Sequence, residues 1–368
     1  MLDTLKHNTA ATALVAMATG LLGIRWMRWH THSRRRMVII GSRDSPLAMY
    51  QANEVKSKLE KAHGKQFRFR ILNMSTFGDN ELSKPLAALA CANPGLFTTE
   101  LETRLVKKEF DIVVHSLKDM PTTLPPGLVL ASITEREAPE DVLLVHRKHR
   151  GCGGLANLPD GAIIGTSSVR RKSIILRNYP TLDVQSIRGN LQTRLTKLDN
   201  PTESNVIYDA IVLAKAGVTR LGWSNRIEAT LLPDTFPYGV GQGSLGIECR
   251  SDDQVIHQLV NADTVQHMPS ALRCVAERAV MRTLQGGCQM AMGVSSTLSH
   301  KGMLSLYVIV LSEDGQQTVQ ATQHRSVATI DDANYMGIDT ARELKDLGAM
   351  QLLDTTSVAP RQLTYGNA

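Results

Sequence analysis

The feature that most constrains the fold is a repeated unit of a short apolar strand, a turn of glycine and small polar residues, and a helix. In the first unit the strand covers residues 37–40, the turn 41–45 and the helix 46–62. Comparable strands precede the turns at residues 165–168 and 188–190. Because strands that alternate with helices pair with one another beneath those helices, the repeat predicts α/β layers built on parallel strands.

Proline and glycine clusters divide these units into two groups. One cluster lies at residues 121–126 and the other at 233–243, and we interpret both as crossings between two α/β domains. Beyond them, a helix over 270–284, an alternating strand at 303–311 and a helix at 339–348 predict a smaller α+β domain. The expected organisation is an N-terminal extension at 1–36, a first domain at 37–136 with 241–262, a second domain at 140–237, and a third domain at 265–356.

The composition narrows the range of functions. The chain has 368 residues, 42% of them hydrophobic and 21% charged, which suits a globular protein of several domains. A net charge of +6 and an aromatic content of 4% are both low for a nucleic-acid-binding protein. The five cysteines form no CxxC pair and the histidines no HExxH pattern, which favours a reducing compartment over a disulfide framework or a zinc site. We therefore expect no metal and no nucleic-acid partner.

Residues 1–36 differ in character from the rest of the chain. Their mostly apolar run at 10–24 is shorter than the roughly 20 residues that a membrane-spanning helix needs. Basic residues follow this run, which is the reverse of the order in a secretory signal. The segment is interpreted as a disordered extension or as a targeting segment for a mitochondrion or plastid. An internal start at Met37 would yield the body alone, and the body is expected in the cytoplasm and away from membranes.

Arginines accompany small polar residues at the turns between strands and helices. In an open parallel sheet these turns lie at the carboxyl ends of the strands, where ligands bind. Helix N-termini attract anions there, and arginine adds paired hydrogen bonds to a carboxylate or phosphate. A single such arginine is equally well explained by a local ion pair, whereas a whole set indicates a substrate with many acidic groups. The arginines concerned are Arg43, Arg170, Arg171, Arg188, Arg194 and Arg220.

An acid and a thiol stand out as candidates for chemistry. Asp119 ends a strand beside Lys118, among turns that are otherwise rich in cations. Its carboxylate could stabilise a developing positive charge or transfer a proton, and a structural ion pair is the alternative. Cys288 follows two glycines after a helix, so its thiol is either a covalent attachment point or an ordinary loop thiol. Cys249 and Cys274 lie within apolar patterns and are expected in the core.

Seven short motifs occur in order along the body of the chain, over about residues 37–355. They are GSRDSPLA at 41–48, VVHSLKDMPT at 113–122, GTSSVRR at 165–171, SIRGN at 186–190, VGQG at 240–243, AERA at 276–279 and GGC at 286–288. Together these motifs resemble those of the porphobilinogen deaminase family, also called the hydroxymethylbilane synthases. Seven matches in order are far more specific than any one of them.

The resemblance implies a fold and a reaction. The fold would consist of two α/β domains like the lobes of periplasmic binding proteins and a smaller α+β domain that carries a dipyrromethane cofactor on Cys288. The enzyme would be a transferase that joins four porphobilinogen molecules, with loss of ammonia, into the linear tetrapyrrole hydroxymethylbilane. It would work as a monomer on this small substrate, whose acetate and propionate groups account for the many arginines.

The resemblance also assigns roles to particular residues. Asp119 would be the catalytic acid, beside the cation that forms when ammonia leaves. Cofactor contacts would come from Arg43, Ser45, Lys118, Thr166, Ser167, Arg170, Arg171, Arg188, Gly189 and Arg194. Substrate contacts would come from Arg43, Ser45, Arg188, Arg194 and Arg220.

The sequence departs from the family pattern around the expected cleft. Pro94 and Thr99 stand where lysines are common, and the loop from Asp79 is about two residues longer than usual. Ala291 replaces a usual proline after Cys288. These changes put loop motion and rate in question, so three other functions are weighed. They are a non-catalytic binding protein for a dicarboxylate or phosphate, a nucleic-acid module, and a scaffold that has lost its activity.

Overall fold

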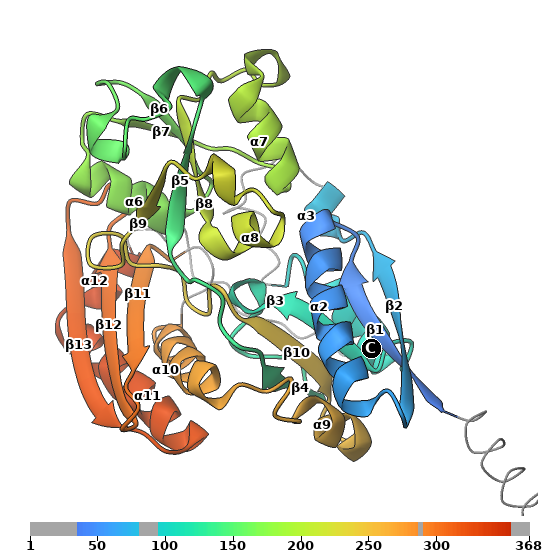
Figure 1. Ribbon diagram of the computed structural model, residues 1–368. Helices are drawn as coiled ribbons and strands as arrows, with labels where there is room; N and C mark the ends of the chain where they lie inside the picture. Colours follow the sequence, from blue (N-terminus) through green and yellow to red (C-terminus); the bar gives the residue numbers. More distant parts are fainter. Residues whose placement is uncertain (1–34, 81–94, 286–289, 355–368) are drawn as a thin grey trace, which may run out of the picture.

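A computed structural model describes residues 35–80, 95–285 and 290–354 (Figure 1). It has two α/β halves that face each other and a third domain built on a three-stranded sheet. The expected fold class, two α/β domains with a smaller α+β domain, is confirmed. Cys288, Cys91, Pro94 and the extension up to residue 34 lie outside the described residues. Within those residues no helix is both long and apolar enough to cross a membrane.

The first domain is built on a five-stranded sheet in the order β2-β1-β3-β10-β4. The strands β1, β2 and β3 are parallel, as expected, but β10 runs antiparallel to both β3 and β4. The sheet therefore contains the expected parallel strands together with one antiparallel strand that the sequence pattern did not indicate. Its elements are β1 (Arg36–Arg43), α2 (Pro46–His63), β2 (Phe67–Met74), α3 (Phe77–Asn80), α5 (Thr99–Val106), β3 (Ile112–Ser116), β4 (Leu128–Ile133), β10 (Leu245–Arg250) and α9 (Gln254–Val260).

The second domain repeats this spatial order with the strands β7-β6-β8-β5-β9. Here β6 is parallel to β7 and β8, and β5 is antiparallel to β8 and β9. Its strands are β5 (Asp141–Val145), β6 (Ile163–Gly165), β7 (Asp183–Gln185), β8 (Ala210–Ala214) and β9 (Ala229–Leu231). Its helices are α6 (Val169–Asn178), α7 (Leu191–Asp199) and α8 (Lys215–Arg220), with short 3-10 turns at Arg147–His149, Leu155–Asn157, Pro201–Glu203 and Ser224–Arg226.

The chain crosses between these domains at residues 134–140 and 232–244. The first crossing was expected at the prolines of 121–126, and this is wrong because β4, which follows them, pairs with β10 in the first sheet. The second crossing contains the glycine-rich segment 239–243, where a link between domains was expected. In each sheet the strand that follows a crossing, β5 or β10, is the one that runs antiparallel. The pocket described below is lined in part by Gln242, Gly243 and Ser244 of the second crossing.

The third domain packs helices on one face of the antiparallel sheet β11-β12-β13 (Figure 1). Its core joins Val280, Leu306 and Met336 from a helix, a strand and a second helix. The helix expected at 339–348 begins earlier, at Ile330, because Thr329 and Asp332 form a capping box there. The elements are α10 (Met268–Thr283), β11 (Met292–Leu298), β12 (Met303–Leu311), β13 (Thr318–Ser326), α11 (Ile330–Asp346) and α12 (Ala349–Asp354).

A buried ion pair ties the crossings to the third domain. Arg136, in the first crossing, donates from Nη1 to Oε1 of Glu277 in α10 at 2.6 Å, and the side chains are 2% and 0% exposed. Glu277 also accepts hydrogen bonds from the backbone N–H of Gly241, in the second crossing, and from Ser296 Oγ. Burial alone would raise the pKa of Glu277, but the Arg136 guanidinium outweighs it and holds the pKa below its usual value. Both crossings are thus anchored to one carboxylate.

Replacing Glu277 with glutamine is expected to lower the free energy of unfolding by about 3–5 kcal/mol, because Arg136 keeps its charge in a buried site without a counter-charge. Urea unfolding at neutral pH measures this loss. Asp339→Asn is the control, since its partly exposed pair with Arg325 contributes at most about 1 kcal/mol. Equal losses in the two variants would contradict the assignment.

Candidate active site

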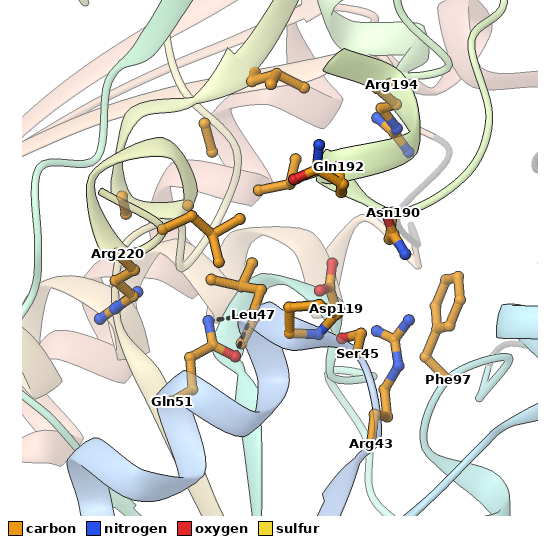
Figure 2. A pocket seen from close by; sticks show the side chains of 18 of the residues that line it. Arg43, Ser45, Leu47, Gln51, Phe97, Asp119, Asn190, Gln192, Arg194 and Arg220 are labelled. Carbon is orange, nitrogen blue, oxygen red and sulfur yellow. Dashed lines mark hydrogen bonds between the residues drawn. The ribbon is translucent and has the colours of Figure 1, made fainter. Parts of the chain in front are cut away.

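A cavity of about 600 Å³ lies between the two α/β domains and is lined from both sides (Figure 2). The carboxyl ends of strands from both sheets, and the N-termini of the helices that follow them, meet here, as expected for parallel strands. Nine of the expected site residues line it, namely Arg43, Ser45, Lys118, Asp119, Arg171, Arg188, Gly189, Arg194 and Arg220. The sequence motifs therefore converge on one pocket although they are spread over both domains.

Asp119 lies in the centre of this pocket with its carboxylate facing the cavity (Figure 2). It closes a 3-10 turn, Leu117–Asp119, that follows directly on β3. Burial lowers the pKa of the neighbouring Lys118, and the Asp119 carboxylate partly restores it. The Nζ of Lys118 also lies 3.4 Å from Oε1 of Gln242, in the second crossing. The acid and the lysine thus form an adjacent pair of opposite charges on the pocket floor.

One wall of the pocket contains a cation, Arg43 at the end of β1, and an aromatic ring, that of Phe97. The guanidinium of Arg43 lies over the ring of Phe97, 4.4 Å from its centroid, and both residues line the pocket (Figure 2). Ser45 caps α2, where its Oγ accepts a hydrogen bond from the N–H of Ala48. The cap explains why a helix begins at this point and directs its N-terminus toward the pocket.

Arg171 is held at the pocket wall by a buried carboxylate. Asp141 is fully buried, and its Oδ1 accepts hydrogen bonds from Arg171 Nη2 at 2.7 Å and from Gln242 Nε2 at 2.9 Å. Arg170 pairs with the other oxygen of Asp141 at 2.8 Å and donates to the carbonyl of Pro237. Burial would raise the pKa of Asp141, but the two arginines hold it well below its usual range. The network connects the start of α6 with the first residue of β5 and with the second crossing.

The turn before α7 contributes a third group of cations. Gly189 has a φ of +109°, and a Cβ there would lie 2.7 Å from the Thr193 side chain, so the turn requires glycine. Arg194 donates from Nε to the carbonyl of Gly189 at 2.9 Å. Burial, together with the nearby cations Arg171 and Arg188, lowers the pKa of Arg194 to about 10. Cations this close together favour the binding of an anion between them.

Three expected site residues are not among the described residues that line the pocket. Arg170 makes the interactions with Asp141 and Pro237 described above. Ser167 donates from Oγ to the carbonyl of Ile187 at 2.6 Å, and Thr166 is buried. Their proposed contacts with a cofactor remain predictions. Cys288, the expected attachment point, lies outside the described residues.

The sequence reasoning missed several polar groups that line the pocket. Gln51 projects from α2 and exchanges hydrogen bonds with Ser116 at the end of β3. Phe97 lies between Pro94 and Thr99, in the segment where only departures from the family pattern were noted. Helical spacing could have suggested Gln51, because it lies four residues after Leu47 of the first motif, on the same side of α2. The remaining polar residues are Asp44, Ser75, Asn190, Gln192, Thr193, Gln242 and Ser244.

The departures at Thr99 and Ala291 fall on ordered structure. Thr99 begins α5, and its Oγ1 donates to the carbonyl of Gly95 at 2.9 Å. Ala291 is buried, and its carbonyl accepts a hydrogen bond from the N–H of Leu311 at 2.8 Å. Both residues therefore have a structural role, whatever the effect of their replacement on rate.

A buried acidic cluster supports the strand that delivers Asp119. His115 of β3 lies 2.9 Å from Oε2 of Glu248 in β10, so it is a hydrogen-bonded structural histidine. Glu102 of α5 is buried nearby, and burial, with the neighbouring Glu248 carboxylate, raises its pKa. The cluster therefore joins α5, β3 and β10 behind the pocket.

Replacing Glu102 with glutamine is expected to remove the contribution of this carboxyl group to the pH dependence of the free energy of unfolding. The folded state holds the Glu102 proton more tightly than the unfolded state, so this acid stabilises the fold at low pH and the contribution is lost as pH rises through its raised pKa. A tenfold difference in proton affinity between the two states is worth about 1.4 kcal/mol. As pH increases from acid to neutral, the free energy of unfolding of Glu102→Gln should increase relative to that of the parent, because the variant has no carboxyl group at this position to ionise. The exposed Glu109→Gln serves as control, and parallel curves for all three proteins would refute the assignment.

Two family models match nearly the whole body of the chain. The one described as "Porphobilinogen deaminase, dipyromethane cofactor binding domain" matches residues 38–258, and "Porphobilinogen deaminase, C-terminal domain" matches 271–346. A porphobilinogen deaminase of Gloeobacter violaceus is 47% identical over 327 residues, which cover 89% of this chain and 95% of the relative. One from Nostoc sp. is 42% identical over 323 residues, with 88% and 95% covered.

Solved structures show a more remote similarity. The periplasmic VFT2 domain of Bordetella pertussis BvgS has a TM-score of 0.37 at 13% identity, over 65% of this chain and 90% of that one. The methionine-binding protein MetQ has a TM-score of 0.36 at 11% identity, over 63% and 93%. The sequence relatives and the family models, by contrast, cover the pocket and the third domain together. The chain therefore belongs to the porphobilinogen deaminase family, transferases of tetrapyrrole biosynthesis that use a dipyrromethane cofactor to polymerise porphobilinogen to hydroxymethylbilane.

Proposed function

We propose that this chain joins four porphobilinogen molecules in the pocket between its two α/β domains, with Asp119 as the catalytic acid. The observation that carries the proposal is the placement of one central carboxylate among cations from both domains. A binding protein for a simple dicarboxylate would have no evident use for an acid at the centre of its anion site. The nine converging site residues thus favour a reaction in which positive charge develops on a polyanionic substrate.

The donor set fits the dipyrromethane cofactor of the family. Each pyrrole of that group carries two carboxylates, and Arg43, Arg171, Arg188 and Arg194 offer guanidinium groups from both sides of the cavity. Burial, followed by the neighbouring cations Arg171 and Arg188, lowers the pKa of Arg194, so a carboxylate bound there would favour its charged form. When bound, the cofactor supplies the terminal pyrrole carbon to which new units are added. Arg188, Arg194 and Arg220, with Arg43 and Ser45, would hold the carboxylates of the incoming substrate.

Asp119 would act on the substrate in two ways. Its carboxylate stabilises the positive charge that develops as ammonia leaves the aminomethyl carbon, and it moves protons at the pyrrole nitrogen and the α-carbon. Lys118 and Gln242 hold the floor of the pocket on either side of it. Phe97 covers the site from the β1 side and limits the access of water to Arg43.

Cys288 would carry the cofactor through a thioether. Of the described cysteines, Cys249 and Cys274 are fully buried, and burial raises the pKa of Cys249 to about 12 and that of Cys274 as well. A thiol with a raised pKa is a poor nucleophile, and neither side chain lines the pocket. The glycines before Cys288 allow an exposed turn, and the family motif falls on the same residue.

We propose further that the enzyme is a cytoplasmic monomer that binds no nucleic acid, with residues 1–36 as an extension or targeting segment outside the catalytic body. The family assignment and the mild charge of the chain support this view. A fusion of residues 1–36 to a fluorescent protein would test the targeting role directly.

The proposed function is tested by intact mass and turnover together. Full-length protein made in a cell that synthesises porphobilinogen should carry the added mass of two linked pyrroles, and peptide mapping should place it on Cys288. The same protein should convert porphobilinogen to hydroxymethylbilane and ammonia. An unmodified Cys288 in folded protein would favour the binding-protein function, and a loaded protein without turnover would favour lost activity.

A further inference from the structure

Arg220 joins the two α/β domains on the side of the pocket opposite Arg43 and Phe97 (Figure 2). It is the last residue of α8, in the second domain, yet its Nε donates to Oε2 of Glu54 in α2 of the first domain at 3.3 Å. Its Nη2 donates to the carbonyl of Gly243, in the second crossing, at 3.1 Å. One guanidinium therefore contacts both domains, a crossing and the pocket wall.

The same two helices also meet through apolar groups. A Cβ on Gly217 of α8 would lie 3.6 Å from Cδ2 of Leu47 in α2, an ordinary van der Waals distance, so the two helices lie close together here. Leu47 and Arg220 line the pocket, whereas Glu54 is not among its described lining residues. Glu54 can therefore influence bound substrate only through Arg220.

The cavity is too small for the longest chain that the proposed reaction makes. Its volume of about 600 Å³ lies within the roughly 300–1,000 Å³ that accommodates one drug-sized ligand. A two-ring primer with four added units has six rings, and each ring bears two carboxylates. The cleft must therefore widen as the chain grows, and contacts that span it, such as the one between α2 and α8, must loosen.

The Glu54–Arg220 pair is suited to opening because both partners retain another contact. Glu54 lies 3.7 Å from Lys58 Nζ, one turn further along α2, and Arg220 keeps the carbonyl of Gly243. The Glu54 side chain is 27% exposed, so water replaces part of what the pair loses. The Arg136–Glu277 pair is the opposite case, since its charges are almost fully buried and water cannot replace what either partner would lose.

We propose that Glu54 is a positioning residue that holds Arg220 while the cleft is closed and gives it up to a carboxylate of the growing chain as the cleft opens. The proposal rests on the proposed function of the pocket. It predicts that loss of the Glu54 charge favours the open cleft and speeds the addition of the later porphobilinogen units. A partly exposed ion pair of this kind shifts such an equilibrium roughly two- to fivefold.

The opening of the cleft can be followed through Trp223, which lines the pocket three residues after Arg220. The chain has three tryptophans, so Trp26→Phe and Trp29→Phe in the full-length protein leave Trp223 as the single reporter. Glu54→Gln in this background should make Trp223 more accessible to acrylamide in the absence of porphobilinogen. Glu60→Gln is the matched control, because Glu60 pairs with Lys56 on the same helix and should leave the quenching unchanged.

The second readout is the distribution of chain lengths on the enzyme. After a substoichiometric addition of porphobilinogen, intact mass should show fewer partly elongated species for Glu54→Gln than for the parent or Glu60→Gln. Glu54→Asp, which keeps the charge on a shorter side chain, should recover part of the parent distribution. Unchanged quenching and an unchanged distribution in Glu54→Gln would overturn the proposal. If no protein gains pyrrole mass, the proposed function fails instead, and the quenching experiment still decides whether the pair holds the cleft closed.

Discussion

Replacing Asp119 with asparagine is expected to lower kcat by roughly 10²–10⁴ while the protein still folds. The amide keeps the shape of the side chain but carries no charge to balance the cation that forms when ammonia leaves. It also cannot accept and return a proton at the pyrrole. Because Asp119 faces the cavity, the asparagine fits the same space, and Lys118 keeps its contact with Gln242.

The measurement is single-turnover and steady-state conversion of porphobilinogen, with thermal unfolding as a check on the fold. Burial lowers the pKa of Lys118 and Asp119 opposes this, so removal of the carboxylate should lower the pKa further. A limb of the pH–rate profile that reports Lys118 should therefore move to lower pH in the variant. Asp160→Asn, at an exposed turn outside the pocket, is the control. Near-normal turnover in Asp119→Asn would remove the catalytic assignment.

Replacing Cys288 with serine is expected to give a folded protein that carries no pyrrole mass and shows no measurable turnover. Attachment of the cofactor needs a thiolate as nucleophile, and a serine hydroxyl ionises far less readily. Cys249 and Cys274 are not expected to accept the cofactor in place of Cys288, because both are fully buried and their thiol pKa values are raised.

Intact mass of the purified variant measures this effect directly, before any assay of activity. Cys152→Ser is the matched control, since Cys152 is the described cysteine that is only half-buried. It should load and turn over like the parent. A stable and active Cys288→Ser enzyme would refute the model in which this thiol holds the primer.

Local patterns predicted the elements whose signals lie within a few residues. The strand at 37–40 and the helix at 46–62 correspond to β1 and α2, because Ser45 supplies the cap and Pro46 suits the first helical turn. The buried positions of Cys249 and Cys274 also followed from apolar neighbours along the chain. The order of seven motifs was enough to indicate the family before any geometry was known.

Pairing between distant strands was not predictable in the same way. Residues 245–250 carry no signal that places β10 between β3 and β4, or that makes it antiparallel to both. That position depends on where the second crossing returns the chain to the first domain. The misplaced first crossing has the same origin, since the prolines of 121–126 mark a break in the chain but not the sheet to which the next strand belongs.

The sequence by itself determined the residue types of the site, the local turns that present them and the family to which the chain belongs. Only the tertiary structure decided how neighbouring residues divide their roles. Arg170 and Arg171 are adjacent in one motif, yet Arg171 lines the pocket while Arg170 turns to Asp141 and Pro237. The pairing of Glu54 with Arg220 likewise appears only when both domains are assembled. The physical reason is that caps and turns act over a few residues, whereas the burial and partners of a charged side chain are set by segments remote in sequence.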